Sequence, residues 1–226
     1  MTAKKTTSNR KRSRPVEPKK MKIDKRIIGL IIIVIIIVIS SAVFLYLASN
    51  SANNNEDNNT PEGNPIAVFD TTLGTMKIEL FQDKLPITCN NFIKLVNDGF
   101  YDGMIFYRIS DNFMIQAGRY FPDGSEKFSP YGSIEFETSP DVLHVDGAIS
   151  MASTGVQVGG SAEFFICDGA QPGLDGSYAA FGAINIDDNE SFAVLRDIAS
   201  QPHDNSNPAG GGKPLEDIVI NSITIE

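Results

Sequence analysis

Histidine and cysteine are scarce in this chain of 226 residues, which has two of each: His144, His203, Cys89 and Cys167. Zinc and related metals are bound by clusters of these side chains at short, recognisable spacings. The sequence contains no such cluster and therefore predicts no metal site. For the two cysteines it leaves two interpretations open. One is a disulfide, whose geometry a sequence cannot test; the other is two buried thiols that pack as small apolar side chains.

Basic residues are also scarce beyond the N-terminus. Residues 1–26 carry 11 of the 19 lysines and arginines but only 2 of the 28 acidic residues, a net charge of +9. The rest of the chain therefore has 8 basic and 26 acidic residues, a net charge of −18, which argues against a nucleic-acid-binding surface there. For residues 1–26 we expect a disordered cytoplasmic tail. Such a tail either only sets the membrane topology or also attracts anionic lipid headgroups.

Charged residues are absent from residues 27–47, a run of 21 residues dominated by isoleucine, valine and leucine. A helix of this length crosses a hydrocarbon core of about 30 Å. We predict a transmembrane signal anchor over residues 27–48 that contacts membrane lipid. Because the basic residues precede it, the positive-inside rule puts the N-terminus in the cytoplasm and the C-terminal part outside the cell membrane. A cleaved signal peptide is the alternative. The apolar region of a signal peptide is normally about 7–15 residues long, so this run is too long for one, but the small residues at 48–52 would suit cleavage.

Apolar residues are rare in residues 49–64, which are rich in asparagine and serine and are predicted to form a flexible polar linker. Asn58 in this linker and Asn189 further along the chain match the short N-glycosylation sequon. From residue 65 to residue 226 the composition is typical of a globular domain. This length is sufficient for one domain with its own core.

Short apolar segments separated by turn residues predict strands throughout residues 65–226. Pro86 suits the first turn of one helix, and either Ile87, Phe92 and Val96 or the neighbouring Ile93 and Leu95 give it helical spacing. A second helix is expected over residues 190–199, capped by Asn189. Strands are expected at 66–69, 76–81, 106–118 (a hairpin), 148–152, 163–167, 179–185 and 218–225. Many short strands with only two helices predict a mostly antiparallel β-barrel.

The hairpin at 106–118 is the most informative segment. Side chains alternate along a strand, so Arg108 on the first strand can share one face with Met114 and Gln116 on the second. An arginine is always charged and is rarely buried without a partner, and we expect Gln116 to hold it. With Phe113 and Met114 as an apolar floor, the hairpin predicts a pocket with a fixed cationic donor at its rim.

Five motifs follow one another in order along the globular part: F-Y-R-I at 106–109, F-M-I-Q-A-G at 113–118, G-A-I-S-M-A at 147–152, F-F-I at 164–166 and L-D-G at 174–176. Together they resemble the motifs of the cyclophilins, a family of peptidyl-prolyl cis-trans isomerases. The similarity extends over residues 65–226, whose ends are similar to those of compact prokaryotic members. It implies a mainly β fold, an eight-stranded antiparallel barrel closed by two α-helices. It also implies isomerisation of Xaa-Pro bonds without a cofactor.

The resemblance implies which residues form the site. Arg108 would stabilise the twisted prolyl amide, with Gln116 orienting its guanidinium and Phe113 completing the catalytic group. The substrate-binding positions carried over in the same way are Met114, Ala152, Ser153, Glu163, Phe165, Leu174 and Tyr178. The expected partners are proline-containing polypeptides outside the cell membrane, whose folding the enzyme would assist. The catalytic domain is expected to be monomeric.

Several positions depart from the family pattern, among them Tyr107, which replaces a histidine next to the arginine. Glu163 stands where the family usually has glutamine, and an ionised carboxylate only accepts hydrogen bonds; it can accept from a substrate amide or draw Arg108 away from the proline. This departure keeps an alternative function open, a catalytically weak module that binds proline-containing peptides or a partner protein. Gly173 replaces a tryptophan of many eukaryotic members, which predicts weak binding of cyclosporin. Tyr178 replaces a histidine and supplies a similar ring.

Overall fold

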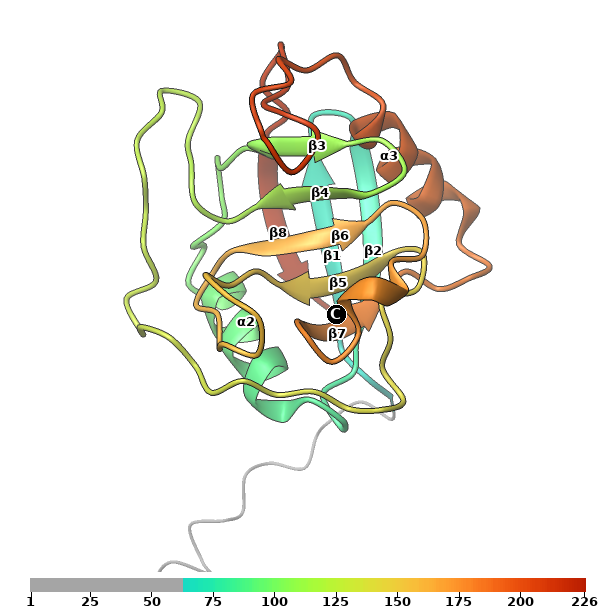
Figure 1. Ribbon diagram of the computed structural model, residues 1–226. Helices are drawn as coiled ribbons and strands as arrows, with labels where there is room; N and C mark the ends of the chain where they lie inside the picture. Colours follow the sequence, from blue (N-terminus) through green and yellow to red (C-terminus); the bar gives the residue numbers. More distant parts are fainter. Residues whose placement is uncertain (1–62) are drawn as a thin grey trace, which may run out of the picture. The chain divides into compact units, whose positions relative to one another are not determined.

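The computed structural model describes residues 63–226 (Figure 1). The predicted cytoplasmic tail at 1–26, the transmembrane anchor at 27–48 and nearly all of the linker at 49–64 lie outside the described residues. Within residues 63–226, none of the helices combines the length and the apolar character that a membrane span requires.

Eight antiparallel strands form one curved sheet, a half-barrel, in the order β3-β4-β6-β5-β7-β2-β1-β8 (Figure 1). The strands are β1 (Ile66–Thr71), β2 (Gly74–Leu80), β3 (Arg108–Ser110), β4 (Met114–Ala117), β5 (Ala148–Met151), β6 (Phe164–Cys167), β7 (Ala179–Ala183) and β8 (Ile220–Ile225). The number and the antiparallel direction of the strands agree with the prediction.

The expected closed barrel is only partly formed, because β3 and β8 are the two ends of the sheet and do not pair as strands. The chain just before β3 instead contacts β8 and the residues before it. Phe106 N donates to Ile218 O at 3.0 Å, and Gly103 N donates to Ile220 O at 2.8 Å. β8 therefore bonds on both sides, to β1 along its length and to this segment at its start.

Alternating apolar residues explain the long strands. Met76, Ile78 and Leu80 of β2 are fully buried, and the residues between them are more exposed, as expected when one face of a strand covers the core. Aromatic rings fill the centre of that core. The ring centroids of Phe92 and Phe164, for example, lie 5.7 Å apart in an edge-to-face contact, an arrangement that aromatic pairs favour.

Two α-helices pack on the sheet, as predicted: α2 (Pro86–Asn97) against β7 and β8, and α3 (Asn189–Ala199) against β2. Their details differ from the prediction at two positions. Ile87 of α2 is 42% exposed, because the buried side of the helix is formed by residues such as Phe92 and Leu95. The cap of α3 is Asp188 and not Asn189, since the Asp188 carboxylate accepts from Ser191 N at 3.0 Å.

The loop at 200–219 matters for the site. It leaves α3, passes over β3 and leads into β8, as the red segment at the top of Figure 1 shows. Gly212 fixes it to β3 through two backbone hydrogen bonds with Ile109, of 2.9 and 3.0 Å. A segment about 100 residues beyond β3 in sequence therefore lies directly beside Arg108.

Candidate active site

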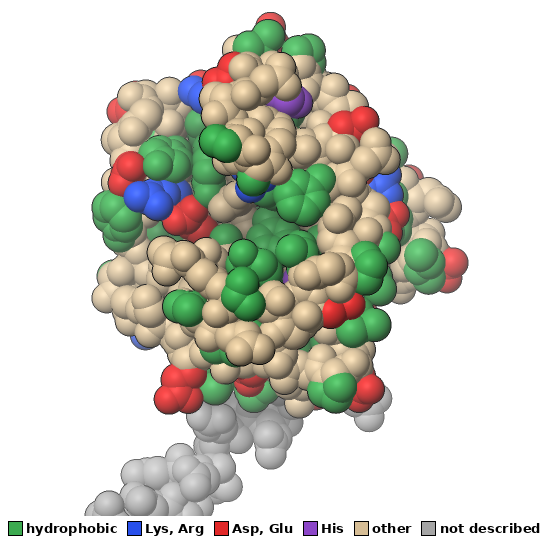
Figure 2. All heavy atoms as spheres, viewed as in Figure 1, with side chains coloured by type: hydrophobic (Ala, Val, Ile, Leu, Met, Phe, Trp, Pro, Cys, Tyr) green, Lys and Arg blue, Asp and Glu red, His purple; other side chains and the backbone are tan. Residues whose placement is uncertain are grey.

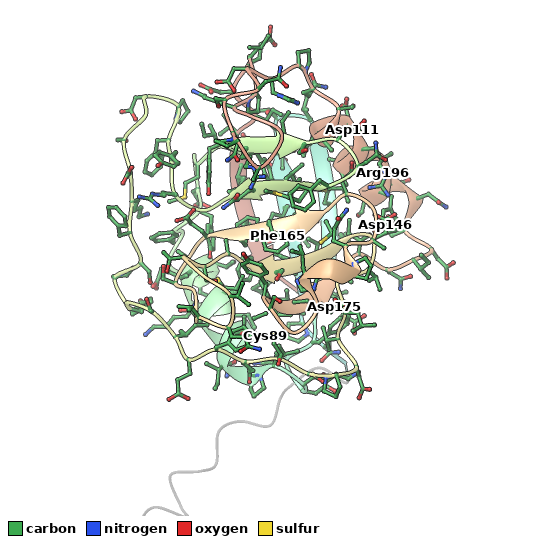
Figure 3. All side chains as sticks on the ribbon, in the orientation of Figure 1. Cys89, Asp111, Asp146, Phe165, Asp175 and Arg196 are labelled. Carbon is green, nitrogen blue, oxygen red and sulfur yellow. The ribbon has the colours of Figure 1, made fainter. Side chains whose placement is uncertain are left out.

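A row of side chains crosses four neighbouring strands of the sheet. Arg108 on β3 is paired with Gln116 on β4, Gln116 with Phe165 on β6, and Phe165 with Ser150 on β5. Directly opposed residues of neighbouring antiparallel strands share a face, so these four side chains lie on one face of the sheet. Figure 3 shows Phe165 near the middle of this face.

A cavity of about 160 Å³ opens over this row. Figure 2 shows apolar side chains gathered around a hollow on this face of the molecule. Nine of the ten predicted site residues line the cavity: Arg108, Phe113, Met114, Gln116, Ala152, Ser153, Phe165, Leu174 and Tyr178. The apolar members come from the β3–β4 turn, β4, the end of β5, β6 and the segment after β6, which includes a 3₁₀ helix (Pro172–Leu174).

The tenth predicted residue, Glu163, lines a second cavity of about 380 Å³. The two cavities adjoin, because Gln116, Ala152 and Ser153 line both. The second cavity also includes Arg119, which the sequence interpretation did not include. The structure thus brings all ten predicted residues to one continuous surface.

The guanidinium of Arg108 is held by the loop at 200–219. Its Nε and Nη2 donate to Gly210 O at 3.1 and 3.0 Å, and Nη2 also donates to Ala209 O at 3.3 Å. The predicted holding role of Gln116 is therefore wrong, since Gln116 is a neighbour across the strands but accepts no hydrogen bond from Arg108 within residues 63–226. The third nitrogen, Nη1, has no acceptor in the same part of the chain. Burial lowers the pKa of Arg108, but a guanidinium remains charged at neutral pH.

Glu163 is engaged away from Arg108. Its carboxylate pairs with Arg119 Nη1 at 3.2 Å and accepts from the Tyr107 hydroxyl at 2.5 Å. The expected competition for Arg108 is therefore not observed. Burial, together with the neighbouring Glu163 charge, raises the pKa of Tyr107, so the hydroxyl remains a donor to the carboxylate. Sequence reasoning missed Arg119 and Tyr107 as partners of Glu163, although both belong to the same hairpin region.

A buried polar chain lies behind Phe165. The ring of His144 stacks on the Phe165 ring with their centroids 5.9 Å apart and 11° between the ring planes. Its Nε2 lies 2.9 Å from Ser150 Oγ and its Nδ1 lies 2.9 Å from Asp175 Oδ1. Burial lowers the pKa of His144, which favours the neutral ring. A serine, a histidine and an aspartate in line suggest a nucleophile, but Ser150 is 0% exposed and no substrate reaches it. These hydrogen-bonded side chains instead support the Phe165 ring from behind, through the stacked ring of His144.

The two cysteines are free and buried, so the disulfide alternative is wrong. Burial raises the pKa of each thiol to about 12, and thiols in that state are poor nucleophiles. Among residues 63–226, no group of three potential ligands is arranged to hold a metal ion. The chemistry that this site offers is thus that of a fixed guanidinium beside an apolar cavity.

Comparisons with known proteins agree with this geometry. Residues 66–225 match the family model for cyclophilin-type peptidyl-prolyl cis-trans isomerases. A peptidyl-prolyl cis-trans isomerase of Synechococcus elongatus is 41% identical over 132 residues, which are 58% of this chain and 87% of the relative. One from Arabidopsis thaliana is 33% identical over 163 residues, 71% of this chain and 93% of the relative.

A solved structure is also similar. The crystal structure of a Cryptosporidium parvum cyclophilin-type isomerase has a TM-score of 0.58 and 29% sequence identity, and the match covers 71% of this chain and 96% of that one. The same protein has been crystallised in the presence of the dipeptide Ala-Pro, with a TM-score of 0.57 to this chain. With a family match over the whole described sheet and both helices, this chain belongs to the cyclophilin family and is a peptidyl-prolyl cis-trans isomerase.

Proposed function

We propose that this isomerase is anchored in the cell membrane and acts on Xaa-Pro bonds of proteins outside it, where it assists their folding. We further propose that Arg108 provides the main stabilisation of the transition state. The observation that carries the second proposal is the way the guanidinium is held at the rim of the apolar cavity.

The reaction sets the requirements for the site. Rotation about a peptide bond has a barrier of about 18–20 kcal/mol, because twisting the amide breaks its resonance. In the twisted state the prolyl nitrogen regains a lone pair and can accept a hydrogen bond, which it cannot do when planar. A donor aimed at this nitrogen binds the transition state better than either planar isomer, and only such differential binding accelerates the reaction.

Arg108 meets these requirements. Two of its nitrogens are bound to Gly210 O and Ala209 O, which restricts the guanidinium before substrate arrives, while Nη1 has no acceptor within residues 63–226. A preorganised charged donor needs little rearrangement as the amide twists. The neighbouring apolar side chains, among them Phe113 and Phe165, would enclose the prolyl ring. Gln116 and the backbone near Ala152 would bind the flanking peptide, and the chain needs no nucleophile for this reaction.

The proposed location rests on the sequence. Eleven basic residues precede the uncharged run at 27–47, and acidic residues outnumber basic ones in the rest of the chain, a pattern that places the C-terminal part outside. Protease added to intact cells should degrade the domain at 65–226 and leave residues 1–26 intact. Protection of the domain until the cells are lysed would contradict the location but not the enzymatic proposal.

The catalytic proposal is tested by prolyl exchange on a short Ala-Pro-Phe peptide, followed by NMR with the full-length chain in a mild detergent. Exchange should be fast, and the Arg108→Ala variant should reduce kcat/KM by about 100-fold or more, as removal of an electrostatic donor typically does. Retained peptide binding in that variant would show that the pocket is intact. Unchanged exchange in Arg108→Ala would refute the proposed role. Peptide binding with only weak exchange in the parent chain would instead favour the alternative of a catalytically weak binding module. The main reason for that alternative was competition of Glu163 for Arg108, and the contact of Glu163 with Arg119 removes it.

A further inference from the structure

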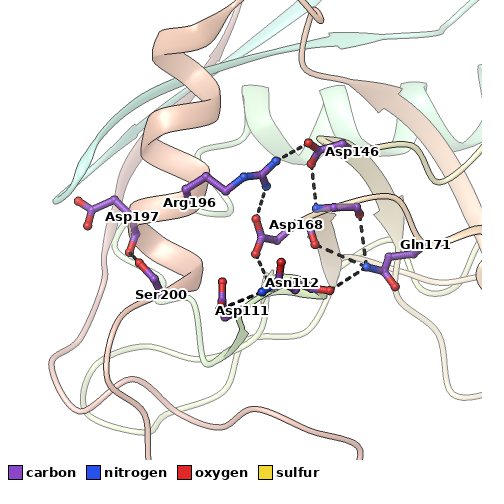
Figure 4. Close-up of polar contacts among 9 residues, drawn as sticks. Asp111, Asn112, Asp146, Asp168, Gln171, Arg196, Asp197 and Ser200 are labelled. Atoms are coloured by element: carbon purple, nitrogen blue, oxygen red, sulfur yellow. Dashed lines mark hydrogen bonds and ion pairs between the residues drawn. The ribbon is translucent and has the colours of Figure 1, made fainter.

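One arginine outside the cavity joins the ends of two strands that lead into it. Arg196 on α3 directs Nη1 to Asp168, which follows β6, and Nη2 to Asp146, which precedes β5 (Figure 4). The planar fork of a guanidinium suits such a double contact. The Asp168 side chain is only 2% exposed, and a buried carboxylate without a partner is strongly destabilising. Arg196 therefore supplies the charged partner that the buried Asp168 carboxylate requires at this position.

The second oxygen of Asp168 reaches the turn between β3 and β4. It accepts from Asn112 N at 2.6 Å, and Asn112 has the left-handed backbone φ of 56° that few residues other than glycine adopt readily. The backbone N of Asp168 also donates to Phe113 O at 3.0 Å. Gln171 adds a third bond, from its Nε2 to Asn112 O at 3.1 Å. One short segment after β6 thus holds the backbone on both sides of the Phe113 side chain.

Phe113 is the residue through which this turn affects the site. Its ring lines the cavity, and the guanidinium carbon of Arg108 lies 5.6 Å from the centre of the ring, within the range of a cation–π contact. A change in the turn therefore changes both the wall of the proposed prolyl pocket and the support of the Arg108 guanidinium.

We propose that Arg196 is a positioning residue for isomerisation: by pairing with Asp168 it fixes the turn at Asn112 and thereby the Phe113 ring. It touches neither substrate nor Arg108. The inference rests on the proposed role of the cavity as the prolyl pocket. A simple stabilising role for Arg196 predicts effects on unfolding only, whereas a positioning role also predicts that its effect on catalysis depends on the presence of the Phe113 ring.

The experiment is a double-mutant cycle on the full-length chain in a mild detergent, with kcat/KM measured by prolyl exchange and corrected for the folded fraction. Arg196→Leu should lower kcat/KM by about tenfold, since a displacement of the order of 1 Å at a distance from the reacting atoms has effects of this size or larger. In the Phe113→Ala background, Arg196→Leu should change kcat/KM by less than about twofold, because coupled residues are non-additive. The change in Tm caused by Arg196→Leu should be similar in both backgrounds.

Two further variants keep the test decisive. Arg196→Lys retains the charge beside Asp168 and so preserves folding, but an ammonium cannot span both carboxylates as a guanidinium does. The Arg196→Lys variant should therefore lose less kcat/KM than Arg196→Leu, about threefold. This loss should also vanish in the Phe113→Ala background. Lys77→Gln removes a distant exposed ion pair with Glu226 and should leave kcat/KM unchanged. If Arg196→Leu folds poorly, the comparison is made with Arg196→Lys alone.

The outcomes separate the two proposals. Equal losses from the Arg196 variants with and without the Phe113 ring would overturn the positioning role and leave the prolyl pocket in place. Unchanged kcat/KM in both Arg196 variants would also overturn the positioning role and leave the prolyl pocket in place. Unchanged kcat/KM in Phe113→Ala by itself would overturn the role of the pocket wall, and the positioning role with it.

Discussion

The loop that holds Arg108 can be displaced by a single methyl group. Gly211 has φ +75°, and a Cβ at this position would lie 2.1 Å from Ile109 O and 2.7 Å from Ser110 Cβ. Since both neighbours belong to β3, which is fixed in the sheet, the loop must move away. Gly211→Ala should therefore break the two hydrogen bonds between Gly212 and Ile109 and carry the carbonyl of Gly210 away from the Arg108 guanidinium.

The size of the effect can be worked out from these contacts. Each of the two backbone hydrogen bonds contributes about 1 kcal/mol, and a left-handed alanine costs about 1–2 kcal/mol in addition. Gly124→Ala is the matched control, because Gly124 has φ +83° with no atom within 4 Å of an added Cβ and so suffers the backbone penalty alone. We expect Tm to be lower in Gly211→Ala than in Gly124→Ala by about 4–8 °C, which corresponds to about 2 kcal/mol.

The activity of the two variants should differ by more than their stability. With its acceptors displaced, the Arg108 side chain loses its fixed orientation, and kcat/KM in the prolyl exchange assay should fall by about 10- to 100-fold. Gly124→Ala should retain the parent value at a temperature where both variants are folded. A Gly211→Ala variant that loses stability but keeps full activity would refute the view that the loop carbonyls preorganise Arg108.

Three further predictions concern other side chains of the domain. His144 has a lowered pKa because it is buried, so its contribution to stability is present above the usual histidine pKa of about 6.5 and is lost as the pH falls. The fall in Tm between pH 8 and pH 5 should therefore be smaller in His144→Gln, and an unchanged pH dependence in that variant would contradict this assignment. Cys89 and Cys167 are buried thiols with pKa values raised to about 12, so a thiol reagent should label neither in the native protein and both after denaturation; fast labelling of the native chain would contradict their burial. Glu163→Gln should lower Tm by no more than about 2–4 °C, since a partly exposed ion pair contributes about 1 kcal/mol or less. It should change kcat/KM by less than about fivefold because Arg119 already keeps the carboxylate from Arg108; a larger gain in activity would show that Glu163 does compete for Arg108.

Local patterns in the sequence predicted much of this fold. The turn residues at 110–112 and the alternation around Arg108 and Gln116 place both side chains on one face, and the sheet pairs these residues directly. Ionic partners were harder to predict. Glu163 has Arg119 only 44 positions away, but which of two arginines a carboxylate reaches depends on the register of β4 against β6, which sequence spacing does not reveal.

The partners of Arg108 could not be predicted at all. They are the backbone carbonyls of Ala209 and Gly210, about 100 residues later in the chain, and every residue has a carbonyl, so no side-chain pattern marks an acceptor. Because backbone acceptors leave no mark in the sequence, the neighbouring Gln116 side chain was expected to hold Arg108. Arg196 gave no signal either, because its fork joins residues that come together only when α3 docks beside the ends of β5 and β6.

The position of β8 has a consequence for how the enzyme matures. β8 completes the hydrogen bonding of β1, at the opposite end of the domain sequence, and its start is bound to the segment before β3. Such pairings between distant residues form slowly, because a long stretch of chain must be ordered first. The loop that holds the Arg108 guanidinium is synthesised immediately before β8. A nascent chain that lacks this region has neither a finished sheet nor the carbonyl that holds Arg108. If Arg108 has the proposed role, we expect isomerase activity to arise together with the final strand pairing and not before it.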